Sequence, residues 1–476
     1  MPPGHYCNLG LEHQLRNALA LADTPPGGSI TLQFSFDGLP ISKSSRKELW
    51  PIQCRILEHH DAAPFVIGVW AGAGKPDSAE EYLAQFLTEL KQLMRNGMSF
   101  DGRVIQVSVH SSICDAPARA FVYCIKPHMA HLGCPKCTVE GDNLNHRAYF
   151  PPVISTLRTD ESVRLQTYYD HHLGVSPLTT LPIDIVSTAP LDYMHLLCLG
   201  VTKKLLDLWF RGPYQKPFEV RFGPDERKQL SKLTLSLGPH VPKEFARKPR
   251  STSEVQHWKA TELIFFLLYS RPVVLKSVLR SDRYKNFLAL HCATFLVSSP
   301  TLCTQYVDYA ESLYKHFVET FAILYGTDRV SYNVHCVLHL ANDVRNFGPV
   351  DAFSAFPFEN NMQFLKRLLR GQNTPLAQLY NRLKEREGKL AARTSSSARN
   401  SSSDIFQLVQ EHKGCLLPPG LTPPQYRCAE FRDFTLTVNP PNNCCVVDNS
   451  IIIADSFART TSTLQVLKWY HLVVPH

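Results

Sequence analysis

The sequence contains no long hydrophobic segment. Its longest apolar run, LIFFLLY at residues 263–269, is far shorter than the roughly 20 residues that cross a bilayer. The first residues, MPPGHYCNLGLEHQL, also lack the basic and then apolar pattern of a secretory signal. We therefore expect a soluble intracellular protein that does not associate with membranes.

Densely spaced cysteines and a complete phosphate-binding loop are missing too. The 14 cysteines are scattered over 476 residues, unlike those of small disulfide-rich secreted domains. Paired cysteines in a reducing compartment are better interpreted as metal ligands than as disulfides. In GVWAGAGKPD, Val69 and Pro76 stand where the loop GxxxxGK[ST] requires Gly and Ser or Thr. We predict no nucleotide cofactor.

Composition sets broad limits on the fold and its partners. With 44% hydrophobic and 19% charged residues, the chain is typical of a globular protein. Its length allows one large core or two to three ordinary ones. The formal net charge of +8 permits an anionic partner, and residues 360–400 contain nine basic but only two acidic residues. This basic stretch is either a solvated helix face or a surface for DNA phosphates.

A strand with one apolar face is predicted early in the chain. In ITLQFSFD at residues 30–37, apolar and polar side chains alternate, which predicts a half-buried strand with Asp37 at its polar end. Strand-like runs follow at residues 52–59 and 64–70.

A helix and a fourth strand come next. Ser78 begins the predicted helix, Gly97 ends it, and RVIQVSVH at residues 103–110 predicts the strand, which leads to Asp115 and a further helix. A right-handed crossover can place this strand beside the first, so Asp37 and Asp115 can share a metal ion. The pattern predicts an α/β RNase H-like core, a mixed sheet flanked by helices. The alternative is that each aspartate only caps a turn.

The rest of the chain divides by composition. Proline-punctuated apolar segments predict a large, mostly α-helical insertion, a Ser-rich stretch predicts a flexible linker, and short β-like runs predict a small β-rich C-terminal tail. The predicted parts are a lead-in helix at 1–29, the first part of the core with a CxxC pair at 30–150, the helical insertion domain at 151–330, the completion of the core at 331–391, the linker at 392–403 and the tail at 404–476.

Two pairs of metal-ligating residues stand far apart in the sequence. Cys134 and Cys137 form a CxxC pair, and His335 and His339 are four residues apart, so both imidazoles can lie on one helix face. Two thiolates and two imidazoles suit a structural zinc site. A redox pair is the competing interpretation of the CxxC, although the strand and helix expected around such a pair are not evident here.

Three further features have both a functional and a structural interpretation. Asp192 and His195 form a DxxH motif that can face a metal, but a helix cap with a core histidine also fits. Trp258 follows the basic residues Arg247, Lys248 and Arg250 and can stack on a base or be buried. Glu359 opens a predicted helix and is followed by Lys366, Arg367 and Arg370, a pattern that surface salt bridges also produce.

Together these motifs resemble the DDE transposases of eukaryotic DNA transposons, most closely the animal branch of the CACTA (En/Spm-like) family. The matching segments span about two thirds of the chain, and they run in the order FSFDGLP at 34–40, ICDAPAR at 113–119, GCPKC at 133–137, PLDYMHL at 190–196, YNVHCVLHL at 332–340 and FSAFPFEN at 353–360.

The resemblance implies catalytic roles for Asp37, Asp115 and Glu359 as ligands of two Mg²⁺ (or Mn²⁺) ions. It makes Asp192 and His195 a family signature of uncertain role. A related vertebrate immune recombinase joins a CxxC to a histidine pair, which strengthens the structural zinc interpretation of Cys134, Cys137, His335 and His339. The implied DNA-binding candidates are Arg119, Arg247, Lys248, Arg250, Trp258, Lys366, Arg367 and Arg370.

The implied activity is cleavage of DNA at transposon ends and strand transfer into target DNA. Carboxylates are the oxygen ligands that magnesium prefers, and two ions can stabilise both the attacking and the leaving oxygen. The implied partners are terminal inverted repeats and target DNA, with a homo-oligomeric active form in the nucleus. Family members usually carry an end-recognition module before the core, which is not evident before residue 30.

Two alternatives stay open. The chain can be a catalytically idle or host-retained relic that binds DNA or protein, or an RNase H-like nuclease that acts on RNA hybrids. The predicted insertion and the DxxH motif argue against the nuclease.

Overall fold

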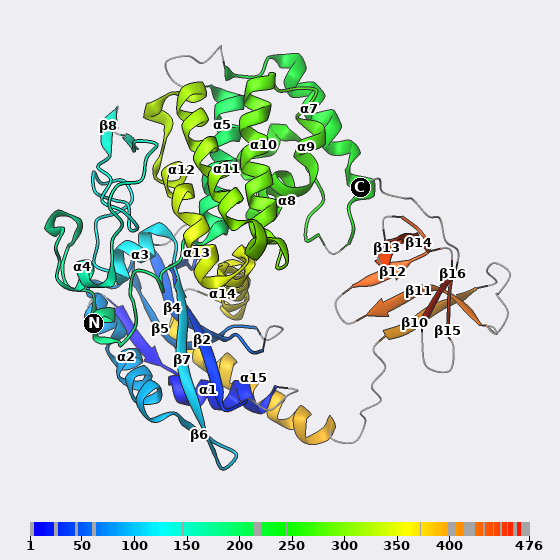
Figure 1. Ribbon diagram of the computed structural model, residues 1–476. Helices are drawn as coiled ribbons and strands as arrows, with labels where there is room; N and C mark the ends of the chain where they lie inside the picture. The colour runs from blue at the N-terminus through cyan, green and yellow to red at the C-terminus, as the bar shows by residue number, and fades with distance from the viewer. Residues whose placement is uncertain are drawn as a thin grey trace. The chain divides into compact units, whose positions relative to one another are not determined.

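A computed structural model gives the structure of the chain (Figure 1). It describes residues 4–22, 27–42, 46–59, 63–144, 147–212, 220–243, 245–371, 373–397, 406–412, 424–431, 434–440, 442–447, 450–454, 456–459 and 464–467. Within these ranges we find no helix whose length and apolar content would let it cross a membrane. The chain forms two compact units, which are described separately. Residues 1–222, 267–272 and 279–396 belong to the first unit, and residues 223–266, 273–278 and 397–476 to the second.

A mixed sheet is the centre of the first unit. Its strands lie in the order β1-β5-β4-β2-β7-β6, and β3 pairs with β4. Only β2 and β7 run parallel, and the other pairs are antiparallel. The bounds are β1 Gly4–Asn8, β2 Ser29–Phe36, β3 Leu39–Pro40, β4 Lys47–Ile56, β5 Phe65–Ala73, β6 Met98–Phe100 and β7 Arg103–Ile113.

The crossover predicted from the sequence is confirmed. Helix α2 (Ala79–Asn96) begins where the Ser78 side chain accepts a hydrogen bond from the Glu81 backbone N–H, and it ends at Gly97, whose φ of 70° favours glycine. The chain then enters β7, which pairs in parallel with β2, so the fourth predicted strand lies beside the first.

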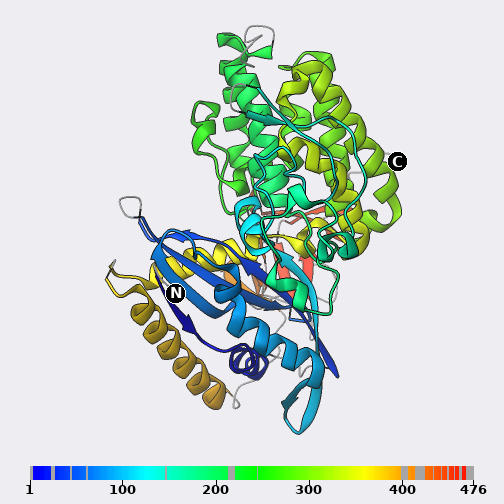
Figure 2. The ribbon, with the colours of Figure 1, turned by 90° about the vertical axis from the view of Figure 1, so that its left-hand side faces the viewer.

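The two faces of the sheet are covered by different helices. On one face, Phe34 and Phe36 of β2 pack edge-on against Phe86 of α2, in a core that also includes α1 (Leu11–Ala20) and α3 (Ala116–Val122). On the other face, Leu49 and Val69 pack with α14 (Phe356–Leu368) and α15 (Pro375–Ser397), which run beside the sheet (Figure 2). Because side chains alternate between the two faces along a strand, the polar residues of β2 point toward this second face.

Helices dominate the remainder of the first unit. Asn286 of α10 donates a hydrogen bond to the Phe317 carbonyl of α11, which ties these two long helices together. Short strands β8 (Asp142–Leu144) and β9 (Arg147–Tyr149) precede the helices. The helices are α4 Asp160–Arg164, a π-helix at Met194–Thr202, α5 Lys203–Arg211, α10 Ser281–Ser298, α11 Leu302–Tyr325, α12 Tyr332–Cys336 and α13 Leu340–Phe347.

The second unit contains short helices and the β-rich C-terminal region that the sequence predicts. Helices α7 (Pro224–Ser236) and α8 (Ala260–Phe265) belong to it, while α9 (Arg271–Val274) begins in the first unit and ends in the second. The predicted helical insertion at 151–330 therefore contributes to both units. The strands are β10 Phe406–His412, β11 Gln425–Phe431, β12 Thr435–Thr437, β13 Cys444–Val447, β14 Ser450–Ile453, β15 Ser456–Arg459 and β16 Leu464–Leu467.

Two segments differ from the sequence-based predictions. The predicted lead-in helix is α1, but strand β1 precedes it and pairs with β5 at the edge of the sheet. Helix α15 continues to Ser397, so the first residues of the predicted Ser-rich linker are helical. A serine run by itself does not end a helix that packing has already begun, because serine is only a weaker helix former than alanine. Residues 398–403 of that linker lie outside the described residues.

Candidate active site and metal centre

Asp37 and Asp115 follow the ends of two neighbouring parallel strands, β2 and β7. Ser35 of β2 is paired with Ile113 of β7, so the parallel register brings the residues two positions further, Asp37 and Asp115, to the same edge. One oxygen of Asp37 accepts a hydrogen bond from the Gly38 N–H at 2.6 Å. One oxygen of Asp115 caps α3 by accepting from the Ala118 N–H at 2.7 Å. Each carboxylate therefore keeps one oxygen outside these local bonds.

Glu359 reaches the same place from a distant part of the chain. It lies in the first turn of α14, which is attached to the polar face of the sheet by two buried glutamines. Gln33 of β2 donates to the Ala352 carbonyl at 2.9 Å, just before the helix. Asn361, two residues after Glu359, donates to Gln53 Oε1 of β4 at 2.8 Å. These bonds hold the start of α14 over the end of β2.

The three acidic residues line one pocket with His195. The His195 Nε2 lies 3.9 Å from Glu359 Oε1, and the side chains of these two residues are 26% and 34% exposed, so solvent and small ions can reach them. One ligand atom each from Asp37, His195 and Glu359 lie within 4.8 Å of one another. The complete lining consists of Ser35, Asp37, Gln53, Ile113, Cys114, Asp115, His195, Ala355, Phe358, Glu359 and Met362.

The electrostatics of this pocket favour a positive charge. Burial raises the pKa of Asp37 well above its ordinary value, and the neighbouring Asp115 and Glu359 carboxylates raise it further. Burial opposes the charge of His195, but its hydrogen bond to Asp192 and the nearby acidic groups outweigh that effect and raise its pKa to about 9. A bound divalent cation would favour the ionised form of the Asp37 carboxyl group.

Asp192 and His195 lie at the start of the π-helix. Asp192 is buried and accepts the His195 Nδ1–H and backbone N–H at 2.7 and 2.9 Å. Its other oxygen accepts the Met194 N–H at 3.3 Å and the Ala355 N–H at 2.7 Å. The cap that the sequence offered as an alternative is present, yet the histidine is not a core residue, because its ring faces the acidic pocket.

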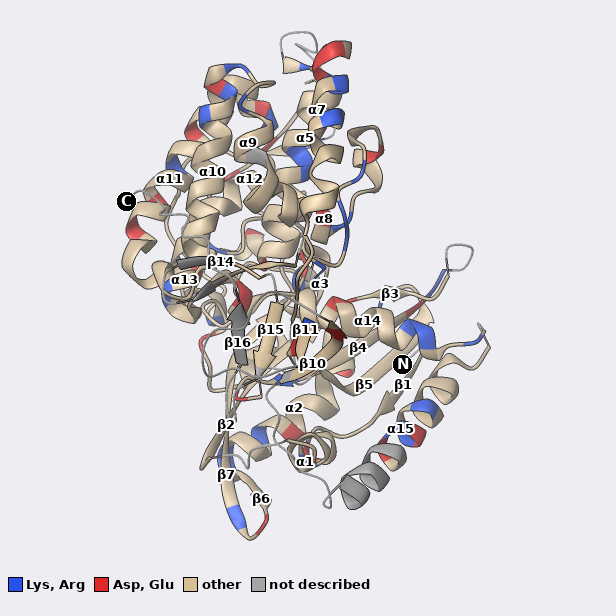
Figure 3. Ribbon diagram, turned by 90° about the vertical axis from the view of Figure 1, so that its right-hand side faces the viewer, with Lys and Arg blue, Asp and Glu red and all other residues tan. Residues whose placement is uncertain are grey.

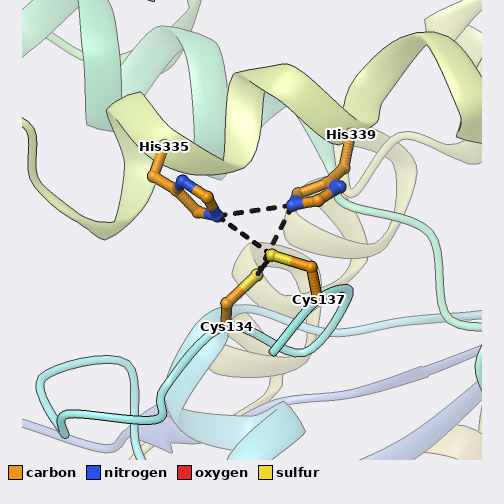
Figure 4. Close-up of side chains that lie close together, drawn as sticks. All are labelled: Cys134, Cys137, His335 and His339. Carbon is orange, nitrogen blue, oxygen red and sulfur yellow. Dashed lines mark hydrogen bonds between the residues drawn. The ribbon is translucent and has the colours of Figure 1, made fainter. Parts of the chain in front are cut away.

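The predicted metal ligands Cys134, Cys137, His335 and His339 also come together. They form a buried Cys₂His₂ cluster that is compatible with a zinc site (Figure 4). Cys137 Sγ lies 3.5 Å from His335 Nε2, and Cys134 Sγ lies 3.6 Å from His339 Nε2. These separations suit four ligands around one tetrahedral ion.

The surroundings of the cluster orient its ligands. The Pro151 carbonyl lies 3.2 Å from His335 Nδ1, which directs the Nε2 of that ring toward the cysteines. Lys136, inside the CxxC loop, makes a buried ion pair of 2.8 Å with Asp343 of α13. The second oxygen of Asp343 accepts the Leu191 N–H at 2.7 Å, next to Asp192. These contacts connect the cysteine loop to the segment that carries Asp192 and His195.

Several predicted DNA-binding residues have other roles. Arg119 is buried and donates to the carbonyls of Ala189 and Pro190, so its guanidinium group is not exposed for a DNA phosphate in this structure. Trp258 is 5% exposed and packs edge-on against Phe266, which leaves no open face for a base. Arg250 pairs with Glu254 and Glu262. In each case the local sequence shows the basic or aromatic side chain, but not the groups that it contacts in the folded protein.

Other predicted DNA-binding residues remain accessible. Arg247 and Lys248 are exposed in the second unit. On α14, Lys366 donates to the Pro40 carbonyl, and Arg367 and Arg370 are exposed just beyond it. Figure 3 shows basic positions on both α14 and α15. A basic surface thus follows directly from the helix that carries Glu359.

Gln33, Gln53 and Asn361 were not identified as site residues from the sequence. A fully buried amide on a strand carries a signal, because a buried polar group has to find a partner. Gln53 in IQCRILEH is such a residue, but nothing local indicates that its partner lies in α14.

No protein-family model matches the chain, and no curated protein sequence matches it.

Proposed function

We propose that the chain is a DDE-type, transposase-derived enzyme with an RNase H-like core that cleaves DNA phosphodiester bonds and transfers the strand into target DNA. The observation that carries this proposal is the meeting of Asp37, Asp115 and Glu359 in one pocket. The adjacent parallel strands β2 and β7 supply the aspartates, and a helix reached after more than two hundred intervening residues supplies the glutamate. The order of the motifs and the family resemblance support the same assignment.

The residues of the pocket suit such a reaction. Two divalent cations held by these carboxylates would neutralise charge on the attacking and leaving oxygens and lower the pKa of a water. Asp37 interacts electrostatically with both other acidic residues and would contribute to both ions. Asp115 and Glu359 would each hold one of them. The exposed Arg367 and Arg370 would hold DNA phosphates near the pocket without reading the base sequence.

We further propose zinc as the occupant of the Cys₂His₂ cluster. Two thiolates and two imidazoles are the donor set of closed structural zinc sites. The ion would join the CxxC loop to α12 and to the 3₁₀ turn Val337–His339, from which the chain continues through α13 towards α14. Zinc would thereby stabilise the position of Glu359 without taking part in the reaction. Action on chromosomal DNA would place the protein in the nucleus.

The test is Mg²⁺-dependent nicking of supercoiled DNA by the purified full chain. Asp37→Asn, Asp115→Asn and Glu359→Gln should each reduce the nicking rate by at least about a hundredfold, because each removes an anionic metal ligand. Glu80→Gln is the matched control, since Glu80 is an exposed carboxylate on α2. It should nick like the unaltered protein.

The outcome separates the proposed enzyme from the alternatives. Nicking that survives in all three pocket variants would refute the assignment of these residues. Binding of DNA without any nicking by the unaltered chain would favour the idle or host-retained relic. Cleavage of RNA–DNA hybrids but not of duplex DNA would favour an RNase H-like nuclease.

A further inference from the structure

His195 is placed as a metal ligand would be. Its Nε2 faces Glu359 Oε1 at 3.9 Å, and its Nδ1 is held by Asp192 Oδ2 at 2.7 Å. The separation from Glu359 is too long for a direct hydrogen bond, yet it is close to the spacing of two atoms that bind one ion. With Asp37, the set offers one nitrogen and two oxygen donors within 4.8 Å of one another.

Asp192 orients the imidazole for this role. It accepts both the His195 ring N–H and the His195 backbone N–H, while its other oxygen accepts the Ala355 N–H that leads into α14. A histidine that binds a metal commonly donates its other ring N–H to a carboxylate, which fixes the tautomer and directs the free nitrogen. The same carboxylate here sets the positions of His195 and of the helix that carries Glu359.

A second observation indicates that the pocket receives an oxygen-bearing ligand. Gln53 is fully buried and lines the pocket. Its Oε1 accepts from Asn361, but its Nε2 has no hydrogen-bond partner among the described residues. A buried amide N–H without an acceptor is destabilising. Water molecules of a hydrated cation, or a phosphate oxygen, would satisfy it.

We propose that His195 is a direct ligand of the divalent cation held between Asp37 and Glu359. The two ions of the site then differ, because the one between Asp37 and Asp115 has only oxygen donors from the described residues. Imidazole binds Mn²⁺ and later transition metals better than Mg²⁺, which prefers oxygen ligands. The site formed by Asp37, Glu359 and His195, with both oxygen and nitrogen donors, should therefore bind Mn²⁺ in preference to Mg²⁺. This inference rests on the proposed function for the presence of the second ion.

The competing role for His195 is that of a cation that neutralises the carboxylates and stays apart from any metal. A protonated imidazole has no lone pair to offer, so the two roles predict different spectra. Mn²⁺ bound next to an imidazole nitrogen shows ¹⁴N modulation in pulsed electron paramagnetic resonance, whereas Mn²⁺ with oxygen ligands does not.

The experiment uses the full chain, first loaded with Zn²⁺ to fill the Cys₂His₂ cluster and then titrated with Mn²⁺. The unaltered protein should show ¹⁴N modulation, and His195→Gln should lose it and bind Mn²⁺ about 10- to 100-fold more weakly. His316→Gln, which changes an exposed histidine on α11, is the matched control and should keep both properties. Mg²⁺ affinity should change less in His195→Gln than Mn²⁺ affinity does.

A further variant covers the case in which His195→Gln fails to fold. Asp192→Asn keeps a side chain of the same shape and should weaken the ¹⁴N modulation while circular dichroism stays unchanged. Two bound Mn²⁺ ions without ¹⁴N modulation in the unaltered protein would overturn the role of His195 and leave the proposed function intact. Clear ¹⁴N modulation in a chain that never nicks DNA would overturn the proposed enzyme and leave the metal site intact.

Discussion

Among single residues, Asp37 is the carboxylic acid of the pocket whose pKa is clearly raised. Burial and two neighbouring carboxylates raise its pKa above the ordinary value of 3.8. Its folded state therefore binds protons more tightly than its unfolded state does. The free energy of unfolding of the metal-free chain should fall as the pH rises from about 4 through the folded pKa of this group.

We expect Asp37→Asn to stabilise the metal-free pocket at pH 8. The amide removes the buried charge, so the midpoint of thermal unfolding should rise by about a few degrees, with zinc kept in the Cys₂His₂ cluster. The gain should shrink toward pH 4, where the aspartate of the unaltered protein is protonated. Differential scanning calorimetry at both pH values measures it. Asp77→Asn, at an exposed position before α2, should have no such effect. An equal or lower midpoint for Asp37→Asn at pH 8 contradicts this account.

At the scale of elements, the site depends on how α14 is attached. Three hydrogen bonds hold its start. Gln33 donates to the Ala352 carbonyl, Asn361 donates to Gln53, and the Ala355 N–H donates to Asp192. The partners come from β2, from β4 and from the residues before the π-helix. Glu359 is therefore positioned by the sheet and by the helical region together.

The Cys₂His₂ cluster acts on the same element through α12 and α13. We expect Cys137→Ser to lose one zinc ion per chain and to lower the free energy of unfolding by on the order of several kcal/mol. Cys137 is fully buried, so the vacated ligand position cannot be filled by bulk water without opening the core. Metal analysis by mass spectrometry and thermal unfolding measure the two effects.

The matched control for this change is Cys292→Ser, because Cys292 is an exposed free cysteine. It should retain the zinc and the unfolding midpoint of the unaltered protein. A native preparation that contains no zinc, or a Cys137→Ser variant that retains it, would argue against zinc as the occupant.

For the whole molecule, the effect of the net charge of +8 on DNA binding depends on where the basic residues lie. Lys366, Arg367 and Arg370 follow Glu359 on one helix or directly after it, whereas Arg119 is buried and Arg250 is paired. Lys366, Arg367 and Arg370 should contribute to the affinity for DNA, because accessible cations release counterions from phosphates.

We expect the double variant Arg367→Gln and Arg370→Gln to weaken DNA binding similarly for unrelated sequences. The slope of log affinity against log salt concentration should become shallower by about one for each phosphate that the variant no longer neutralises. Fluorescence anisotropy at several salt concentrations measures the slope. Arg95→Gln removes an exposed arginine from α2, on the other side of the sheet, and should leave the slope unchanged. An unaltered slope in the double variant would exclude this surface as a DNA-binding site.

Much of the fold was open to prediction from the sequence because it depends on local periodicity. The alternation in residues 30–37 identified β2 and its polar edge, and the cap at Ser78 and the stop at Gly97 identified α2. Strand β1 and the helical continuation to Ser397 were not predicted. β1 is a strand because it pairs with β5, which lies far away in the sequence. Helix α15 extends to Ser397 because the packing of its earlier residues has already formed the helix.

The candidate metal-binding side chains were identified from the sequence: Cys134, Cys137, His335 and His339 from their spacings, and Asp37, Asp115 and Glu359 from their predicted positions and the family resemblance. Tertiary packing places Glu359 and His195 in the same pocket as the aspartates and buries Arg119 and Trp258. Asp192 orients the His195 ring and holds the Ala355 N–H before Glu359. Local sequence patterns do not predict such contacts, because the partners lie far apart along the chain. Periodicity and caps act over a few residues, whereas these contacts join positions that are brought together only when separate elements pack on one sheet.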